Sequence, residues 1–357
     1  MAEAETQAVG EVGLPRALIV AGPTASGKSA LALTLAERYR GAVINADSMQ
    51  VYRDLRVLTA RPSAEDEARA PHLLYGVRDA AEAADAAWFR QAALAAMGEA
   101  RGMGRVPILC GGTGLWLEAL VRGIGEIPPI PAAIRAEARR LAAELGAPAL
   151  HARLAERDPE TAAALHPSDT QRVIRAWEVL QATGRGLAAW WRGAAHPPAP
   201  WLFAHILLDP PRDRVRAAID ARFLAMLERG ALEEVRTLLA RGLDPALPAM
   251  RAHGVPPLAA AIRGELSLAE AVARAQAQVR QYAKRQTTWF RHRKLAPPER
   301  TFTIRSWMGA GAQFSEINMA ALFSFVDAFL LTPHGTVGIT ASSPAPAGPG
   351  PAEGPLR

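Results

Sequence analysis

The segment GPTASGKS has the residue types and spacing of a loop that binds phosphate groups. Its glycines let backbone N–H groups converge on phosphate oxygens, Lys28 adds a compact positive charge, and the Ser29 hydroxyl is suited to Mg²⁺. An incidental glycine-rich turn is the alternative. We predict a phosphate site made of Gly22, Pro23, Thr24, Ala25, Ser26, Gly27, Lys28 and Ser29.

The elements around this loop favour an α/β fold. The apolar run 17–22 precedes the loop, and residues with helical spacing follow it, which is the context that a phosphate loop requires. The runs 42–47, 106–112 and 205–209 read as further buried strands, and helical stretches lie between them. This alternation predicts a parallel sheet flanked by helices.

The chain divides by composition into four parts. Residues 1–15 read as a flexible leader, and residues 16–122 together with 199–332 as a discontinuous core that carries the phosphate loop. Residues 123–198 follow a proline-rich break and show helical patterns without strands, which predicts an all-helical insertion domain. Residues 333–357 are rich in Pro, Gly, Ser and Ala, and we expect a disordered tail.

Two further strand ends carry polar residues. Asp47, Ser48, Met49 and Gln50 follow the second predicted strand, and Thr113 follows the third. Ligands of open parallel sheets bind beyond the carboxyl ends of the strands, so an acid, a hydroxyl and the phosphate loop are expected to share one crevice. A helix cap or a turn is the alternative role for Asp47 and for Thr113.

The bulk properties indicate an intracellular protein with an anionic partner. The formal net charge is +6 and the sequence pI is about 10.0, which is compatible with nucleic acid as a partner. Cys110 is the only cysteine, so an internal disulfide is excluded. Signal-peptide and membrane-spanning patterns are lacking, and we expect a soluble, cytoplasmic protein without membrane association.

Several blocks resemble the tRNA dimethylallyltransferases, enzymes that attach an isopentenyl group to tRNA. The resemblance covers about 300 residues in the order of the family. Besides the phosphate loop, it rests on DSMQVYRDLRVLTARP at 47–62, APHLL at 70–74, GGTGLWLEAL at 111–120, HPSDTQRVIRAWEV at 166–179 and RQYAKRQTTWFR at 280–291.

The resemblance implies a reaction. In this family the loop holds the diphosphate of dimethylallyl diphosphate, and the five-carbon group passes to N6 of the adenine at tRNA position 37, in tRNAs that read codons starting with U. It implies Asp47 as the base and Thr113 as a second catalytic residue. It also implies Mg²⁺ as cofactor with Ser29 as its ligand, and the anticodon stem-loop of tRNA as partner. Arg222 is a further candidate diphosphate ligand, with a surface arginine as the alternative.

The family also implies residues that contact tRNA. The chain departs from the family where Gly254-Val255-Pro256 replaces a usual Gly-Tyr-Arg. On the helix 276–293, Trp289 and Phe290 are expected to anchor to the core, while basic residues serve diphosphate or RNA. The implied tRNA contacts are Asp47, Ser48, Met49, Gln50, Thr113, Arg135, Gln171, Arg172, Val173, Ile174, Arg175, Arg251, Ala252, His253, Gly254, Val255 and Pro256.

Three other functions remain open at this point. A nucleotide kinase of the phosphate-loop class shares the loop and the sheet, which also makes ATP a possible ligand. An adenylate isopentenyltransferase shares the loop and the chemistry but lacks the tRNA-binding insertion. An RNA-binding module with a decayed loop is the third, and the complete loop counts against it. We expect the protein to be a monomer.

Overall fold

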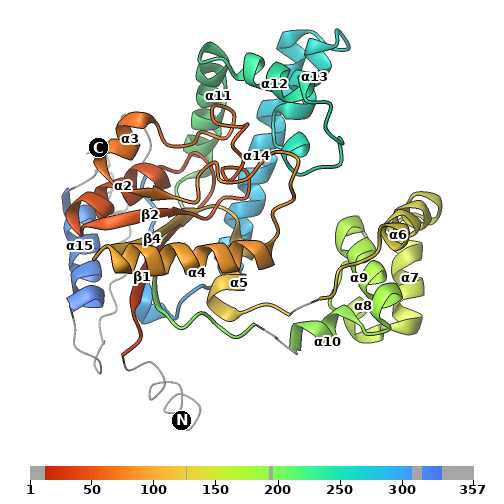
Figure 1. The fold of residues 1–357 in the computed structure, drawn as a ribbon, viewed down its shortest axis with the longest axis horizontal. Helices are drawn as coiled ribbons and strands as arrows, with labels where there is room; N and C mark the ends of the chain where they lie inside the picture. The colour runs from red at the N-terminus through yellow and green to blue at the C-terminus, as the bar shows by residue number, and fades with distance from the viewer. Residues whose placement is uncertain (1–12, 126, 193–195, 308–315, 332–357) are drawn as a thin grey trace, which may run out of the picture. The chain divides into compact units, whose positions relative to one another are not determined.

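The computed structural model describes residues 13–125, 127–192, 196–307 and 316–331. Its centre is a six-stranded sheet in the order β3-β2-β4-β1-β5-β6, and every strand pair is parallel. Strands β1, β2 and β4 of this sheet are labelled in Figure 1 together with the helices α2 and α4. The prediction of an α/β fold with a parallel sheet flanked by helices is confirmed. The predicted leader lies mostly outside the described residues, and the predicted tail lies entirely outside them.

The strands and helices alternate along the chain. The strands are β1 (Arg16–Ala21), β2 (Gly41–Asn45), β3 (His72–Leu73), β4 (Val106–Gly111), β5 (Leu202–Leu208) and β6 (Thr301–Ile304). The helices of the sheet-containing part are α2 (Lys28–Arg38), α3 (Ala64–Arg69), α4 (Ala86–Gly102), α5 (Gly114–Arg122), α11 (Arg212–Glu228), α12 (Ala231–Ala240), α13 (Val255–Ile262), α14 (Leu268–His292) and α15 (Glu316–Leu331), with 3₁₀ turns at Ala249–Arg251 and Pro298–Arg300.

The central strands are buried on both faces, as their unbroken apolar runs require. Side chains alternate between the two faces of a strand. Leu18 and Val20 of β1 therefore join a core cluster with Leu31 and Leu35 of α2, and Leu322 of α15 belongs to the same cluster. The neighbouring strand β5 sends His205 toward the other face, where its ring lies 6.3 Å from the ring of Phe290 on α14.

Two edge strands and the start of one helix differ from expectation. β3 and β6 were not predicted, because they have two and four residues and no periodic pattern. α14 begins at Leu268 rather than near residue 276. Ser267 and Glu270 form a capping box there, since each side chain accepts a hydrogen bond from the other residue's backbone N–H.

The chain forms two compact units within the described residues. The first runs to Leu117 and resumes at Pro200, and the second is Glu118–Ala199. The second unit contains α6 (Ala132–Leu145), α7 (Ala147–Arg157), α8 (Pro159–Ala163), α9 (Thr170–Thr183) and α10 (Leu187–Arg192). These helices have their own apolar core, which includes Leu150, Leu154 and Val173. The proposed insertion boundaries, 123–198, fall inside this unit.

Among the residues that the structure describes, no helix combines the length and the apolar character needed to cross a bilayer.

Candidate active site

Three loops meet at the carboxyl edge of the sheet. β1 leads into the phosphate loop, β2 into residues 46–50, and β4 into Gly112 and Thr113; β4 lies between β1 and β2 in the sheet. The Ala46 N–H donates to the Cys110 carbonyl (2.8 Å), and the Thr113 N–H donates to the Ala46 carbonyl (3.3 Å). The last two loops are thus joined directly through their backbones.

The phosphate loop turns sharply into α2. Gly27 has φ of 93°, in the left-handed region that side chains with a Cβ rarely adopt, and it is the N-cap of α2. The Lys28 ammonium donates to the Pro23 carbonyl (3.3 Å). The Ser26 hydroxyl is buried without a hydrogen-bond partner within the described structure. Buried polar groups are normally paired, so an unpaired hydroxyl in this loop is what a site for an anion would show.

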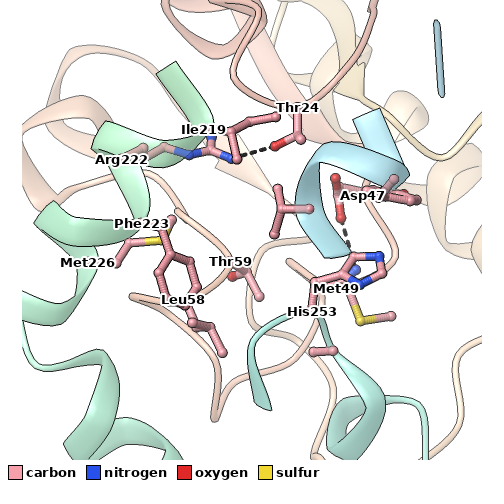
Figure 2. A pocket seen from close by; sticks show the side chains of 13 residues that line it. Thr24, Asp47, Met49, Leu58, Thr59, Ile219, Arg222, Phe223, Met226 and His253 are labelled. Atoms are coloured by element: carbon pink, nitrogen blue, oxygen red, sulfur yellow. Dashed lines mark hydrogen bonds between the residues drawn. The ribbon is translucent and has the colours of Figure 1, made fainter. Parts of the chain in front are cut away.

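A pocket opens beside these loops (Figure 2). The loops that follow the strands, and the helices α11 and α14, each supply both polar and apolar residues to it. The lining residues are Thr24, Asp47, Met49, Leu58, Thr59, Ile219, Arg222, Phe223, Met226, Ala252, His253, Val279 and Tyr282.

One face of α11 supplies both a charge and apolar surface to this pocket. Ile219, Arg222, Phe223 and Met226 follow the i, i+3, i+4, i+7 spacing of a single helix face. Arg222 Nη2 donates to Thr24 Oγ1 (2.5 Å), which ties this helix to the phosphate loop (Figure 2). Arg222, the further candidate diphosphate ligand, therefore lies beside the phosphate loop.

The Asp47 carboxylate is held in a fixed orientation within the pocket. Its Oδ1 accepts the Met49 N–H (3.0 Å), and the Asp47 N–H donates to Asn45 Oδ1 (2.8 Å). The Thr113 hydroxyl accepts the Ser48 N–H (2.9 Å) and so fixes the next residue of the same loop. Asp47 and Thr113 therefore lie in one hydrogen-bonded unit, in which Thr113 bonds the loop rather than the Asp47 side chain.

The charges around Asp47 are unbalanced. Burial lowers the pKa of Lys28, and the nearby Asp47 carboxylate opposes that shift. Burial also lowers the pKa of the Arg222 guanidinium, again opposed by Asp47. Two partly desolvated cations thus share one carboxylate. Burying a charge without full compensation is unfavourable, so the site favours a further anion.

Tyr282 and His253 form the remaining polar wall. Their rings lie 4.7 Å apart between centroids. Burial raises the pKa of Tyr282 above its usual value, and the Asp47 charge adds to this shift. Burial lowers the pKa of His253, with a further lowering by Arg285, so the imidazole is neutral at pH 7. A neutral phenol and a neutral imidazole therefore face the carboxylate.

Gln286 joins two loops of the site and was not predicted to do so. Its Oε1 accepts the Thr24 N–H (2.8 Å), and its Nε2 donates to the Gly112 carbonyl (2.9 Å). Tyr282 lies one helical turn earlier on α14. Both belong to the RQYAKRQTTWFR block, and their i, i+4 spacing indicates that they share one face of the helix. The sequence alone does not reveal which loops this face contacts.

The basic residues of α14 are partly engaged within the protein. Arg280 pairs with Asp220 (2.5 Å) and Arg291 with Asp209 (2.9 Å), which occupies both guanidinium groups. Lys284 is exposed. Phe290 is buried, as expected of an anchor.

The structure separates the predicted tRNA contacts into exposed and buried side chains. In the first unit, Arg251 and Pro256 are exposed, whereas Val255 is fully buried. Gly254 has φ of 98°, and a Cβ on it would lie 3.0 Å from Leu58 and 3.2 Å from Phe223. His253 and Ala252 line the pocket. This segment therefore contributes pocket wall as well as surface.

Gln50 is used inside the same unit. Its Nε2 donates to the carbonyls of Thr59 (2.9 Å) and Ala60 (3.1 Å). These two bonds use the amide hydrogens of Gln50 inside the protein.

In the second unit, Arg135 and Gln171 are exposed, and Ile174 is half-buried. Arg172 pairs with Asp169 (3.4 Å) and Arg175 with Glu178 (3.4 Å). Val173 is 0% exposed in the helical core, so its side chain is excluded from any contact with RNA.

The donor set near the pocket fits a magnesium ion that arrives with phosphate. Among the described residues, no group of three or more His, Cys, Asp or Glu side chains is placed to hold a metal. Mg²⁺ is often bound by one or two protein oxygens together with substrate phosphates and water. Ser29 is exposed at the start of α2, which leaves its hydroxyl accessible for this role.

Comparisons with known proteins agree with this geometry. Residues 50–293 match the IPP transferase family, and residues 15–75 match an isopentenyl transferase family. A tRNA dimethylallyltransferase from Granulibacter bethesdensis is 55% identical over 314 residues, which covers 88% of this chain and 98% of that protein. A tRNA dimethylallyltransferase from Rhodospirillum centenum is 60% identical over 280 residues, which covers 78% of this chain and 89% of the relative.

Two solved structures are also similar to this chain. The full-length tRNA isopentenylpyrophosphate transferase of Bacillus halodurans is 32% identical, with a TM-score of 0.62 over 88% of this chain and 96% of its own. A eukaryotic dimethylallyltransferase acting on tRNA shares the fold at 23% identity, with a TM-score of 0.73 over 88% of this chain and 79% of its own. By sequence and by fold, this chain belongs to the tRNA dimethylallyltransferase (IPP transferase) family.

Proposed function

We propose that this protein transfers the dimethylallyl group of dimethylallyl diphosphate to N6 of the adenine at position 37 of tRNAs that read codons starting with U. The products are N6-(dimethylallyl)adenosine in tRNA and diphosphate. The observation that carries the proposal is the pair of desolvated cations, Lys28 and Arg222, beside a single carboxylate, Asp47, and an apolar wall.

The two parts of the donor match the two parts of the pocket. Diphosphate supplies the anion that Lys28 and Arg222 lack, and the unpaired Ser26 hydroxyl lies in the same loop. Ile219, Phe223 and Met226 supply apolar surface next to Arg222, which suits a short branched hydrocarbon. A helix face that presents one charged and three apolar side chains over about two turns fits a molecule with a charged head and a small apolar tail.

The reaction replaces one bond with another. The allylic C–O bond breaks, the C–N bond to the adenine N6 forms, and N6 loses a proton. Asp47 accepts that proton, which compensates for the poor nucleophilicity of an amine whose lone pair is delocalised into the ring. Lys28, Arg222 and the loop N–H groups stabilise the negative charge that develops on the departing diphosphate.

The loop around Asp47 keeps this geometry. Thr113 holds the Ser48 N–H and thereby fixes the residue that follows the base. We assign Thr113 to this positioning of the catalytic loop. The Ser29 hydroxyl would hold Mg²⁺, which, when bound, neutralises diphosphate charge and improves the leaving group.

The acceptor reaches the site from a tRNA anticodon loop. Enzymes that modify a base commonly extrude it from its stack, and Asp47, Ser48, Met49 and His253 are proposed to face the extruded adenine. Arg251 on the first unit, and Arg135, Gln171, Arg172 and Arg175 on the helical unit, are proposed to contact the RNA around it. We propose further that the protein acts in the cytoplasm as a monomer.

The test is an acceptor and donor comparison with purified protein and Mg²⁺. We expect dimethylallyl diphosphate and a tRNA with adenines at positions 36 to 38 to yield the dimethylallyl nucleoside, read by mass analysis of the digested tRNA. Modification of free AMP instead of tRNA would indicate an adenylate isopentenyltransferase, and phosphate transfer from ATP would indicate a kinase. An unmodified tRNA beside correctly folded protein would refute the proposal.

A further inference from the structure

The pocket wall formed by residues 55–60 has no regular secondary structure to support it. Leu58 and Thr59 of this segment line the pocket, and Leu58 is 7% exposed. The segment nevertheless has to keep a fixed position, because a loose wall cannot select a small hydrocarbon. The contacts that hold it therefore decide the shape of the pocket.

Glu234 accepts hydrogen bonds from three consecutive backbone N–H groups of this segment. Its Oε1 accepts from Arg56 (2.6 Å) and Val57 (2.7 Å), and its Oε2 accepts from Leu58 (2.8 Å). Hydrogen bonds to an ionised acceptor are short and stronger than neutral ones. Three of them on adjacent residues fix the backbone directly before and at the pocket-lining Leu58.

Glu234 also lies close in the chain to the helix that forms the adjacent wall of the pocket. It lies on α12, which follows α11, the helix of Arg222, Phe223 and Met226. The two walls meet near Gly254, where an added Cβ would approach both Leu58 and Phe223. The Glu234 carboxylate therefore joins the 55–60 wall to the helices that carry the other wall.

A second tether holds the far end of the same segment. Gln50 Nε2 donates to the carbonyls of Thr59 and Ala60. Gln50 directly follows Met49, the backbone partner of Asp47. The segment is thus bonded at its start by Glu234 and at its end by the catalytic loop. Movement at either end would shift Leu58 and Thr59 within the pocket.

We propose that Glu234 is a positioning residue that sets the place of the Leu58–Thr59 wall and thereby makes the pocket select the five-carbon donor. This rests on the proposed function, because it assumes that the pocket holds the dimethylallyl group. Glu234 itself does not line the pocket, so it acts through the segment that it holds.

The substitution Glu234→Gln isolates this role. A glutamine keeps the size of the side chain but offers one acceptor oxygen in place of two, and its NH₂ group would face a backbone N–H. At least one of the three amides then loses its partner. The wall should become looser, which weakens the fit of the small hydrocarbon and admits a larger one.

Glu233→Gln is the matched control. Glu233 is the preceding residue on α12, is exposed, and pairs with Arg236 on the helix surface. It has the same chemistry and nearly the same position in the sequence, but it makes no hydrogen bond to residues 56–58 among the contacts described.

The experiment combines steady-state kinetics with amide hydrogen exchange. For Glu234→Gln we expect the KM for dimethylallyl diphosphate to rise about tenfold with the KM for tRNA unchanged, since the loss of one hydrogen bond to a charged acceptor has an effect of this order. The preference for dimethylallyl over geranyl diphosphate should fall, and the amides of residues 56–58 should exchange faster. Glu233→Gln should match the wild type in all four measurements.

A purely structural role would reduce the amount of folded enzyme and leave both KM values and the donor preference unchanged. That result, or unchanged exchange at residues 56–58, would overturn the inference. If the wild type and Glu233→Gln transfer no allyl group, the proposed function fails instead. If the wild type and Glu233→Gln are active and Glu234→Gln behaves like them in every measurement, the proposed function stands and only the role of Glu234 is refuted.

Discussion

Asp47 occupies the one position in the pocket where a carboxylate adjoins both cations and the neutral polar wall. Asp47→Asn preserves the size of the side chain and its carbonyl acceptor for the Met49 N–H but removes the base. We expect kcat to fall by about 10²–10⁴-fold. The KM for dimethylallyl diphosphate should stay the same or fall, because Lys28 and Arg222 lose a competing anion.

The measurement is steady-state transfer of the allyl group to tRNA, with donor binding determined separately. A variant that keeps the full rate would remove Asp47 from the role of base. A variant with a raised KM and normal kcat would assign Asp47 to donor binding.

His205 makes the sheet sensitive to acid. It is 0% exposed, neither ring nitrogen has a hydrogen-bond partner within the described structure, and burial lowers its pKa to about 3. The unfolded chain, with a histidine pKa near 6.5, therefore binds more protons between these values, and stability falls as the pH drops below 6.5. At pH 5.5 this residue should contribute a loss of about 1.4 kcal/mol relative to neutral pH.

Urea unfolding at pH 7.5 and 5.5 measures this loss. His205→Leu replaces the ring with an apolar side chain and should remove about that part of the pH dependence, whereas His292→Gln, at an exposed position on α14, should not. An equal pH dependence in wild type and His205→Leu would show that other groups control acid unfolding.

The residues of the site differ in how far the sequence reveals them. The phosphate loop, Asp47 and Arg222 stand in recognisable local patterns, and the structure brings Thr24, Asp47 and Arg222 to one pocket. Glu234 and Gln286 contact residues about 180 and 260 positions away. Their roles depend on the packing of distant helices, and no short pattern around them encodes which backbone groups they meet.

At the scale of elements, α14 is the helix that joins the active-site loops. One face carries Val279 and Tyr282 to the pocket, and then Gln286 to Thr24 and Gly112. Trp289 lies about one turn after Gln286 on α14, and its ring packs so closely against Gly114 that an added Cβ there would clash with it. The loops after β1 and β4 are therefore positioned from the same helix.

Gln286→Leu should test this arrangement. The change leaves the Thr24 N–H and the Gly112 carbonyl without partners in a buried setting, at a cost of about 1–3 kcal/mol in the free energy of unfolding. Because Thr24 is also the partner of Arg222, we expect a raised KM for dimethylallyl diphosphate as well. Thermal unfolding and donor kinetics measure the two effects.

Thr287→Ala, at the next position of α14, is the control for Gln286→Leu. A stability loss without any change in the donor KM would mean that Gln286 supports the fold but does not shape the phosphate loop.

Strands and helices were predictable from the sequence where their hydrophobic pattern extended over enough residues. The four strands with continuous apolar runs were predicted, and β3 and β6 were not, because short edge strands gain their order from pairing with a neighbour. The start of α14 was predicted about two turns too late. The signal was present as Ser267 and Glu270, but the surrounding alanines carry no strong periodicity that would extend the helix to them.

At the scale of the whole molecule, the positive charge is spread over both units. The formal net charge is +6, and arginine accounts for nearly all of the basic residues. Many guanidinium groups are paired with carboxylates. In the helical unit, Arg172 pairs with the partly exposed Asp169, and Arg175 pairs with the buried Glu178. A surface ion pair such as Arg172–Asp169 contributes little to stability, so Arg172 can exchange its carboxylate partner for a phosphate at small cost. Arg175 can keep its bond from Nη1 to Glu178, because a guanidinium has further N–H donors for a phosphate.

This exchange predicts a salt-dependent signature for Arg172 and Arg175. If each contacts a phosphate of the anticodon stem-loop, the logarithm of the association constant for tRNA should fall linearly with the logarithm of the salt concentration. Arg172→Gln and Arg175→Gln should each reduce the magnitude of that slope by about 0.7–0.9. Donor binding should respond less to salt, because Lys28 and Arg222 are desolvated and poorly screened.

Arg140→Gln provides the comparison, because Arg140 is also paired with carboxylates on an exposed helix of the same unit, Glu137 and Glu144, and is not a proposed tRNA contact. Equilibrium binding of tRNA at several salt concentrations gives the slopes. Since Arg140→Gln changes the net charge by the same amount, an equal reduction in all three variants would point to a general effect of charge. A reduction confined to Arg172 and Arg175 would locate the anticodon stem-loop on the N-terminal half of α9.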